Sequence, residues 1–154
     1  MKNFLQLTLK QALHNLHSGE GGPFGAVIVK NNKVISQAHN TVMKDNDPTA
    51  HAEINAIRQA CKKLKTYHLA DCVLYTNAEP CPMCLAAAYW ARIKKIFYIN
   101  SKEEVKKYTP FIDAKIYKEL CSDEKSISLQ QISTDHAEGL QLLKQWQKEN
   151  KDFY

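Results

Sequence analysis

Two short motifs in this chain hold residue types that bind metal ions and transfer protons. His51 and Glu53 stand two positions apart, and Cys81 and Cys84 stand three positions apart in a C-x-x-C pattern. One imidazole and two thiolates suit Zn²⁺, and a set of three ligands leaves the fourth position to water, as catalytic zinc sites do. Glu53 is not required as a ligand and could accept the proton of that water. The motifs predict Zn²⁺ as a cofactor held by His51, Cys81 and Cys84.

Neither motif taken alone is specific for a catalytic zinc ion. A C-x-x-C pair also occurs in structural and redox sites, and a partly buried histidine is usually structural. Together the motifs match H-x-E…P-C-x-x-C, the pattern of zinc deaminases. This joint match favours a hydrolytic enzyme. The alternative is a protein without catalytic activity, a binding module that zinc stabilises.

The spacing of His51 and Glu53 raises a geometric question, because side chains two apart on a helix point to different faces. Asp47-Pro48 precedes His51 and Pro82 follows Cys81, and both prolines indicate helix starts. The two motifs then lie in the first turns of two helices, where side chains fan around the axis and can converge beyond its end. Helix N-termini also stabilise thiolates.

These helix starts belong to an alternation of strands and helices. Apolar spacing predicts a helix over 3–17, strands over 26–30 and 33–39 joined by an Asn31-Asn32 turn, a helix ending near Lys65, a strand over 72–76, a helix from Pro82 to Arg92 and a strand over 95–99. Strands 72–76 and 95–99 are nearly all apolar, as expected of strands buried on both faces.

The remainder of the chain is predicted to hold short helices around IYKEL, a weak strand SISLQQI, and a last helix with a capping-box-like start at Asp135 and Glu138. This order predicts an α/β fold in which a mixed sheet carries helices on both faces. Ligands of such sheets bind at the carboxyl ends of strands, where both motifs stand.

Length and composition predict one domain over residues 1–154. The first twenty residues mix polar and apolar types, so neither a signal peptide nor a membrane helix is expected there. An odd number of cysteines, five, argues against a disulfide framework. We therefore expect a cytoplasmic protein in which Cys61, Cys72 and Cys121 are small buried hydrophobic residues.

The net charge of +5 does not by itself indicate a nucleic-acid partner. Only Arg58 and Arg92 among 21 basic residues are arginine, the residue best suited to phosphate contacts, and the lysines are scattered. A solvated lysine surface is the favoured interpretation, and no membrane partner is expected. Five histidines stand at no ligand spacing and are predicted to be structural or surface residues: His14, His17, His39, His68 and His136.

The chain resembles the cytidine-deaminase-like superfamily and, within it, the bacterial guanine deaminases. The superfamily resemblance rests on TAHAEINAIR and EPCPMC. The narrower resemblance covers nearly the whole chain and rests on GGPFGAVIVK, NDPTAHAE, LYTNAEPCPMCLAAAYWARIKKIFY, FIDAKIYKEL and the closing DFY. The tRNA adenosine deaminases share the zinc motifs but are not similar in FIDAKIYKEL.

This resemblance implies a three-layer αβα sandwich with a five-stranded mixed sheet and one Zn²⁺ per chain. It implies hydrolysis of guanine to xanthine and ammonia. It also implies a homodimer in which the C-terminal helix and tail, about residues 135–154, are exchanged between subunits so that each tail helps close the partner's site.

The resemblance also assigns residues by position. His51, Cys81 and Cys84 would bind zinc and Glu53 would shuttle protons, while the purine would be surrounded by Phe24, Asn40, Trp90, Asp113 and Tyr154. Asn40 offers a donor and an acceptor to a purine edge, and Asp113 can accept from an N–H group and assist proton transfer. Phe24 and Trp90 could stack on a flat base, or could serve as a loop anchor and a core residue.

One segment departs from the family pattern, so the identity of the substrate stays open. SKEEVKKYTPF is rich in lysine at a place expected near the substrate edge. Guanosine, cytosine and an aminotriazine therefore stay as alternatives to guanine. A tRNA adenosine deaminase is the second hypothesis, and it would need basic surface to hold an RNA stem-loop.

Overall fold

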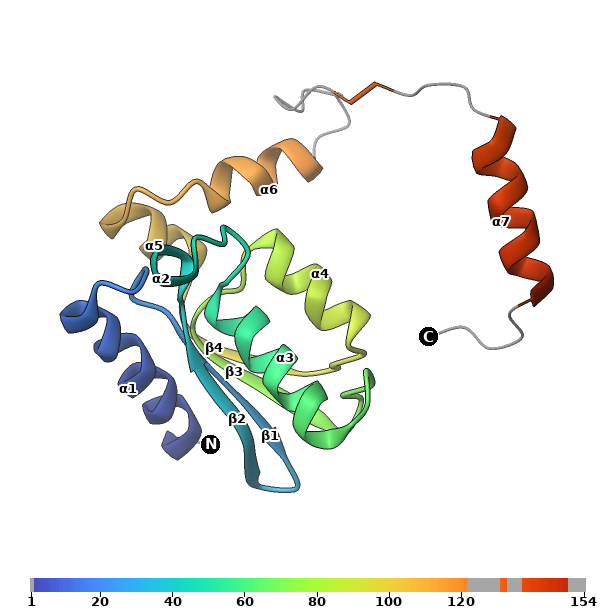
Figure 1. The fold of residues 1–154 in the computed structure, drawn as a ribbon. Helices are drawn as coiled ribbons and strands as arrows, with labels where there is room; N and C mark the ends of the chain where they lie inside the picture. The colour runs from blue at the N-terminus through green and yellow to red at the C-terminus, as the bar shows by residue number, and fades with distance from the viewer. Residues whose placement is uncertain (1, 122–130, 133–136, 150–154) are drawn as a thin grey trace. The chain divides into compact units, whose positions relative to one another are not determined.

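The computed structural model describes residues 2–121, 131–132 and 137–149. The chain divides into two compact units, Met1–Cys121 and Ser122–Tyr154, and each is described by itself. The elements in chain order (Figure 1) are α1 (Lys2–Ser18), β1 (Gly25–Lys30), β2 (Lys33–His39), α2 (Val42–Asp45), α3 (Ala52–Leu64), β3 (Cys72–Ala78), α4 (Pro82–Trp90), β4 (Ile96–Asn100), α5 (Lys102–Tyr108), α6 (Asp113–Cys121) and α7 (Ala137–Glu149).

The sheet of the first unit is mixed, as predicted. Its strand order is β2-β1-β3-β4, with β1 antiparallel to both neighbours and β3 parallel to β4. The β1–β2 hairpin turns at Asn31 and Asn32, whose φ angles of 49° and 59° lie in the left-handed region. Asparagine tolerates this region, which a two-residue hairpin turn requires, so the predicted turn is confirmed.

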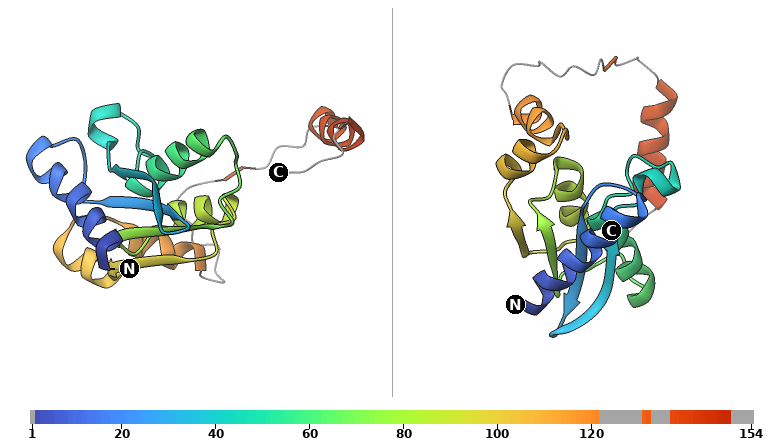
Figure 2. Two further views of the ribbon diagram at one scale, coloured as in Figure 1. Left: turned by 90° about the horizontal axis from the view of Figure 1, so that it is seen from below. Right: turned by 90° about the vertical axis from the view of Figure 1, so that its left-hand side faces the viewer.

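Helices cover both faces of the sheet, which confirms the layered α/β prediction (Figures 1 and 2). Val27 and Val29 of β1 point toward α1, where they pack near Phe4. The alternate residues Ala26 and Ile28 face the cluster formed with α3 and α4. This inward and outward alternation follows from the two-residue period of a strand.

A close approach of α1 to β1 explains the glycine with which the strand begins. A Cβ atom at Gly25 would collide with the backbone carbonyl of Thr8 in α1. Thr8 itself is fully buried, and its hydroxyl donates to the carbonyl of Leu5 one turn earlier. The glycine therefore lets the helix lie directly on the sheet beside the start of β1.

Three predictions about burial were wrong, one of them that of Cys121, which is exposed rather than buried. Strand β4 is only half-buried, because it has a strand neighbour on one side alone in the described sheet. An apolar run shows that a strand avoids water but not that neighbours flank both its edges. On α1, the apolar spacing that predicted the helix also predicted a buried apolar face, but three leucines of that spacing are exposed: Leu9, Leu13 and Leu16.

The predicted five-stranded sheet is corrected to four strands in the part of the chain that the structure describes. The segment expected to form the additional strand, SISLQQI, falls largely outside the described residues, and its last two residues have no regular structure. Asp135 also lies outside them. The predicted final helix is confirmed as α7. Searched over the described residues, no helix combines the length and apolar character needed to span a membrane.

Candidate active site

Two helix starts bring the predicted metal ligands together. His51 is the N-cap residue of α3 and Cys81 is the N-cap residue of α4, and both have extended backbone angles. Pro82 occupies the first turn of α4, where a missing N–H costs nothing. Because His51 stands outside its helix while Glu53 stands in the first turn, the two side chains need not diverge as they would in a helix interior.

The distances between these side chains match a zinc site. The Nδ1 atom of His51 lies 3.6 Å from the Sγ atom of Cys81 and 3.6 Å from the Sγ atom of Cys84. Tetrahedral Zn²⁺ with ordinary bond lengths places a nitrogen and a sulfur ligand about 3.6 Å apart. The three ligand atoms all lie within 4.8 Å of one another, so the residues present fit this ion.

The polar contacts shift the pKa values of the two cysteines in opposite directions. Hydrogen bonds with Cys84 and His51 lower the pKa of Cys81 to about 4, so Cys81 is a ready thiolate. The hydrogen bond with Cys81 and burial together raise the pKa of Cys84. The same contact with Cys81 raises the pKa of His51. In the absence of metal, one thiolate is thus stabilised by a thiol and an imidazole around it.

Glu53 lies beside the ligands and is buried, with 6% of its surface exposed. Burial raises the pKa of its carboxyl group to about 7. A carboxyl group with a pKa in this range can both accept and release a proton at neutral pH, as a general acid–base catalyst must. Its position on the same helix turn as the N-cap ligand gives it reach to a reacting group at the metal.

A cavity of about 270 Å³ opens in front of this cluster. It lies where β3 ends, and the residues that line it come from six segments: Gly22, Phe24, Asn40, Val42, Met43, Pro48, His51, Glu53, Ala78, Glu79, Cys81, Val105, Phe111 and Asp113. Small-molecule sites typically measure about 300–1,000 Å³. This cavity therefore suits a small ligand.

Buried amides hold the loops that carry Phe24 and Asn40. The side chain of Asn77 at the end of β3 accepts from the N–H of Gly25 and donates to the carbonyl of Pro23. Asn40 is buried, and its Oδ1 accepts from the N–H of Val42, which leaves its NH₂ group available to a ligand. A Cβ atom at Gly21 would collide with Asn40, so this glycine allows the loop to pass over it.

The other side of the cavity is formed by the start of α6. Asp113 is half-buried there, and this burial raises the pKa of its carboxyl group. The hydroxyl of Tyr117, one turn further along α6, donates to the carbonyl of Pro80 at 2.7 Å and so ties the helix to the loop before Cys81. The ring of Phe111 lies 5.2 Å from that of Phe24, centroid to centroid, at a tilted angle of 59°.

The structure thus brings together six of the residues proposed from the sequence around one cavity, with Cys84 buried behind them: Phe24, Asn40, His51, Glu53, Cys81 and Asp113. Trp90 is not among them. It ends α4, is 71% exposed and does not line the cavity, so it is not a core residue of its own unit, and its stacking role stays a prediction. Tyr154 lies outside the described residues.

Sequence reasoning did not single out eight of the fourteen lining residues, and two of these eight carry an aromatic ring or a charge, Phe111 and Glu79. Phe111 stands two positions before Asp113 in a motif already connected with the substrate, and that proximity was the available signal. Glu79 lies directly between strand β3 and the cysteine motif. Its carboxylate accepts from the N–H of Lys102 and lies 3.6 Å from the Nζ of the same residue. It is the first residue of EPCPMC, a motif already connected with the site, but its spacing indicated no role of its own.

Comparison with known proteins agrees with this site. Residues 1–100 match the model of the cytidine and deoxycytidylate deaminase zinc-binding region. A guanine deaminase of Bacillus subtilis is 46% identical over 143 residues, which are 91% of each chain. The X-ray structure of guanine deaminase from Bacillus subtilis superposes with a TM-score of 0.91 at 41% identity, covering 99% of this chain and 97% of that one.

A second class of relative matches a shorter region. A tRNA-specific adenosine deaminase of Aquifex aeolicus is 46% identical over 95 residues, or 62% of each chain. The region that the family model matches, residues 1–100, contains both zinc motifs and the elements that present them. The resemblance predicted from those motifs is confirmed, and the chain belongs to the family of deaminases that share the cytidine and deoxycytidylate deaminase zinc-binding region.

Proposed function

We propose that this protein hydrolyses guanine to xanthine and ammonia with Zn²⁺ as its cofactor. The observation that carries the proposal is a buried carboxyl group, Glu53, in the same cavity as a three-ligand set with zinc spacing. A structural zinc site would be expected to have four ligands and no need of such a group. The similarity to guanine deaminase along 91% of the chain supports guanine in particular.

The charge of the cavity supports an uncharged substrate. Its described lining contains the carboxyl groups of Glu53, Glu79 and Asp113 and contains no lysine or arginine. A phosphate group would meet no lysine or arginine there and would be repelled by the ionised acids. A free purine base, which presents N–H donors and flat faces, meets acceptors and aromatic rings instead. This favours guanine over a nucleotide.

The proposed reaction adds water to the guanine carbon that bears the amino group. When bound by His51, Cys81 and Cys84, Zn²⁺ would supply Lewis acidity that makes the attacking water easier to deprotonate. A carboxylate oxygen of Glu53 accepts that proton and delivers it to the ring nitrogen, where negative charge develops. Glu53 then takes the second proton of the added water from the new hydroxyl group and transfers it to the leaving amine, which departs as ammonia.

The other lining residues would hold the base in place. The free NH₂ group of Asn40 can donate to an acceptor on the purine edge, and the carboxylate of Asp113 can accept from a ring or exocyclic N–H. The tilted rings of Phe24 and Phe111 form an aromatic corner suited to packing against a flat base. Orienting the substrate in this way lowers the entropic part of the barrier.

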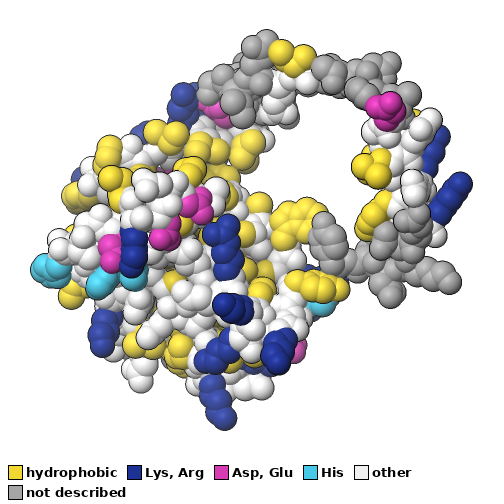
Figure 3. All heavy atoms as spheres, viewed as in Figure 1, with side chains coloured by type: hydrophobic (Ala, Val, Ile, Leu, Met, Phe, Trp, Pro, Cys, Tyr) yellow, Lys and Arg dark blue, Asp and Glu magenta, His cyan; other side chains and the backbone are white. Residues whose placement is uncertain are grey.

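The second candidate is tRNA adenosine deamination, supported by the shorter match to a tRNA-specific adenosine deaminase. The distribution of charge on the described surface argues against it. Lys62 and Lys63 stand in the last turn of α3, whose first residues form the site, so they lie at the far end of that helix. On the face of the first unit seen in Figure 3, many of the Lys and Arg side chains lie in the lower part, while most of the acidic side chains lie above them.

We also propose that the protein is a cytoplasmic homodimer in which residues 135–154 are exchanged, so that Tyr154 helps close the partner's cavity. All five cysteines are free, which supports a reducing compartment. Support for the exchange comes from the resemblance in the closing DFY and from the apolar residues that α7 exposes within its own unit: Leu140, Leu142, Leu143 and Trp146.

An ammonia-release assay with a panel of substrates tests the proposal. We expect turnover of guanine to exceed that of guanosine, adenosine, cytosine, an aminotriazine and a tRNA anticodon stem-loop. Hydrolysis of a free base should change little between low and high salt, whereas action on RNA should fall steeply. Preference for the stem-loop, or no turnover of any of these by zinc-loaded protein, would contradict the proposal.

A further inference from the structure

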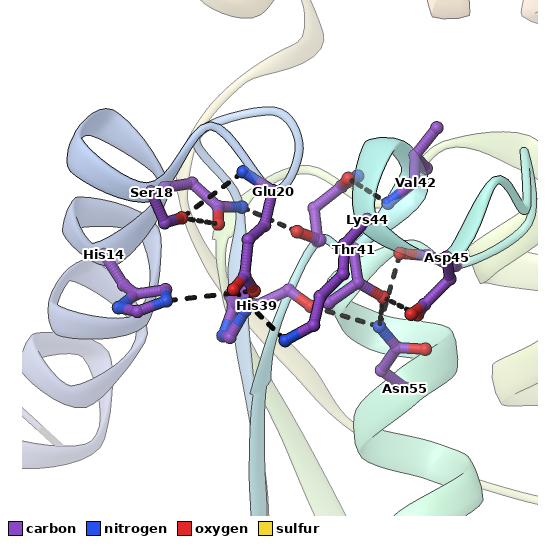
Figure 4. A network of polar contacts seen from close by, with 12 residues as sticks. His14, Ser18, Glu20, His39, Thr41, Val42, Lys44, Asp45 and Asn55 are labelled. Atoms are coloured by element: carbon purple, nitrogen blue, oxygen red, sulfur yellow. Dashed lines mark hydrogen bonds and ion pairs between the residues drawn. The ribbon is translucent and has the colours of Figure 1, made fainter.

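A second group of metal-ligating side chains lies outside the cavity, near the C-terminal end of α1 (Figure 4). His14 projects from α1, Glu20 follows that helix, and His39 ends strand β2. The Nε2 atom of His39 lies 2.7 Å from Oε2 of Glu20, and the Nε2 atom of His14 lies 3.8 Å from the same oxygen. Two imidazoles from different elements are therefore directed at one carboxylate oxygen.

We propose that His14, Glu20 and His39 form a second, weaker site for a divalent transition-metal ion. Their three ligand atoms lie within 4.8 Å of one another. Two nitrogen ligands on a tetrahedral ion of zinc size stand about 3.3 Å apart. Small side-chain rotations therefore bring the group to coordination distance, and the two imidazole rings are already close, with centroids 4.5 Å apart.

The donor set determines which ions the site accepts. Two imidazoles and one carboxylate suit Zn²⁺, Co²⁺, Ni²⁺ and Cu²⁺, whereas Mg²⁺ and Ca²⁺ prefer oxygen ligands. His17 stands one helix turn after His14 and lines the same surface hollow, together with His39. It can supply a further imidazole or face a water that completes the coordination shell.

The second carboxylate oxygen explains why this site is the weaker one. The Nζ atom of Lys44 lies 3.1 Å from Oε1 of Glu20, so the carboxylate can offer an ion only Oε2. The positive charge of Lys44 also opposes an incoming cation. The side chain of His14 is about half exposed, unlike the buried cysteines of the zinc cluster, so water competes for the ion.

The cluster of His14, Glu20 and His39 lies where hydrogen bonds connect several of the loops that line the cavity. The carbonyl of Glu20 accepts from the N–H groups of Met43 and Lys44, which ties the loop after α1 to α2. Asn15 donates to the carbonyls of Gly22 and Asn40. An ion at the cluster would cross-link α1 to the end of β2 and so fasten segments that line the cavity.

Titration of untagged, zinc-loaded protein with Ni²⁺ tests the site. We expect one Ni²⁺ to bind per chain without displacing the first zinc, which metal analysis of the titrated protein measures. His14→Gln and His39→Gln should each weaken Ni²⁺ binding by about tenfold or more. His68→Gln is the matched control, because His68 lies outside the cluster, and it should bind Ni²⁺ as the parent does.

Thermal unfolding supplies a second measurement, since an ion bound only by the folded protein raises Tm. Ni²⁺ should raise Tm of the parent and of His68→Gln but not that of His14→Gln. The proposal is overturned if no Ni²⁺ binds up to about millimolar concentration, where affinity is negligible. It is also overturned if His39→Gln binds Ni²⁺ as the parent does while His17→Gln does not, because the ion would then use only the two histidines of α1.

Discussion

The Nδ1 atom of His51 lies 3.6 Å from the Sγ atom of Cys84, although the two side chains project from the starts of different helices. Removing either side chain leaves two ligands, too few to hold Zn²⁺ tightly. Cys84→Ala should therefore lose its zinc and its activity, as metal analysis and the ammonia assay would show. Cys61→Ala, which removes a cysteine outside the cluster, should retain about one zinc per chain. Full zinc occupancy in Cys84→Ala would disprove the ligand assignment.

Metal removal should expose a reactive thiolate at Cys81. Its pKa is lowered to about 4 by the hydrogen bonds with Cys84 and His51, so the thiolate is the main form throughout the neutral range. Alkylation of Cys81 in metal-free protein should therefore proceed at a nearly constant rate between about pH 6 and 8, whereas an ordinary thiol reacts faster as pH rises.

Peptide mass spectrometry of the alkylated protein would measure this rate site by site. Cys61 is the internal comparison, because burial raises its pKa and should keep its reaction slow. Zinc should protect Cys81 when added before the reagent. Equal rates at Cys81 in the presence and absence of zinc would show that the metal is bound elsewhere.

Glu53→Gln should keep the fold and the zinc but lose turnover, because an amide cannot relay protons. A single general acid–base group contributes about 10²- to 10⁴-fold in rate. Steady-state kinetics should place the loss in kcat, with zinc content unchanged. Glu103→Gln, an exposed acid on α5, is the control. Near-normal turnover in Glu53→Gln would show that Glu53 transfers no protons and only stabilises the start of its helix.

Asp113→Asn should damage guanine turnover selectively. The substitution preserves shape but replaces one acceptor oxygen by a donor, so an N–H group of the substrate loses its partner. Hydrogen bonds to charged groups are worth about 1.5–3 kcal/mol, which corresponds to a loss in kcat/KM of about 10- to 100-fold. Asp71→Asn is the control, since its side chain is 77% exposed and pairs with Lys30. Unchanged kinetics in Asp113→Asn would remove it from the site.

The proposed exchange of C-terminal tails makes a prediction about mixed dimers. Deleting Phe153 and Tyr154 should abolish most activity without loss of zinc. Co-expression of this truncated chain with full-length Glu53→Gln should restore activity, because the intact tail would close the cavity that still has Glu53. Each variant expressed alone is the control. Isolated heterodimers without activity would show that the tail acts within its own chain or not at all.

Local sequence was sufficient for the helix starts and the hairpin. Proline at the first turn of α4 and the extended N-cap residues His51 and Cys81 depend on backbone preferences of a few neighbouring residues. The same holds for the turn at Asn31 and Asn32, where a left-handed backbone selects asparagine. Ligand types and their approximate convergence were therefore readable from the chain alone.

Only the tertiary structure decided which side chains line the cavity together. The same holds for the surface cluster of His14, Glu20 and His39. Phe111 meets Phe24, and His14 meets His39, through contacts between elements far apart in the sequence. Trp90 resembled a stacking residue by type, yet α4 carries it to an exposed end. Periodicity predicts which side chains form the apolar face of an element, but the packing of helices on the sheet determines whether that face is buried and which neighbour it meets.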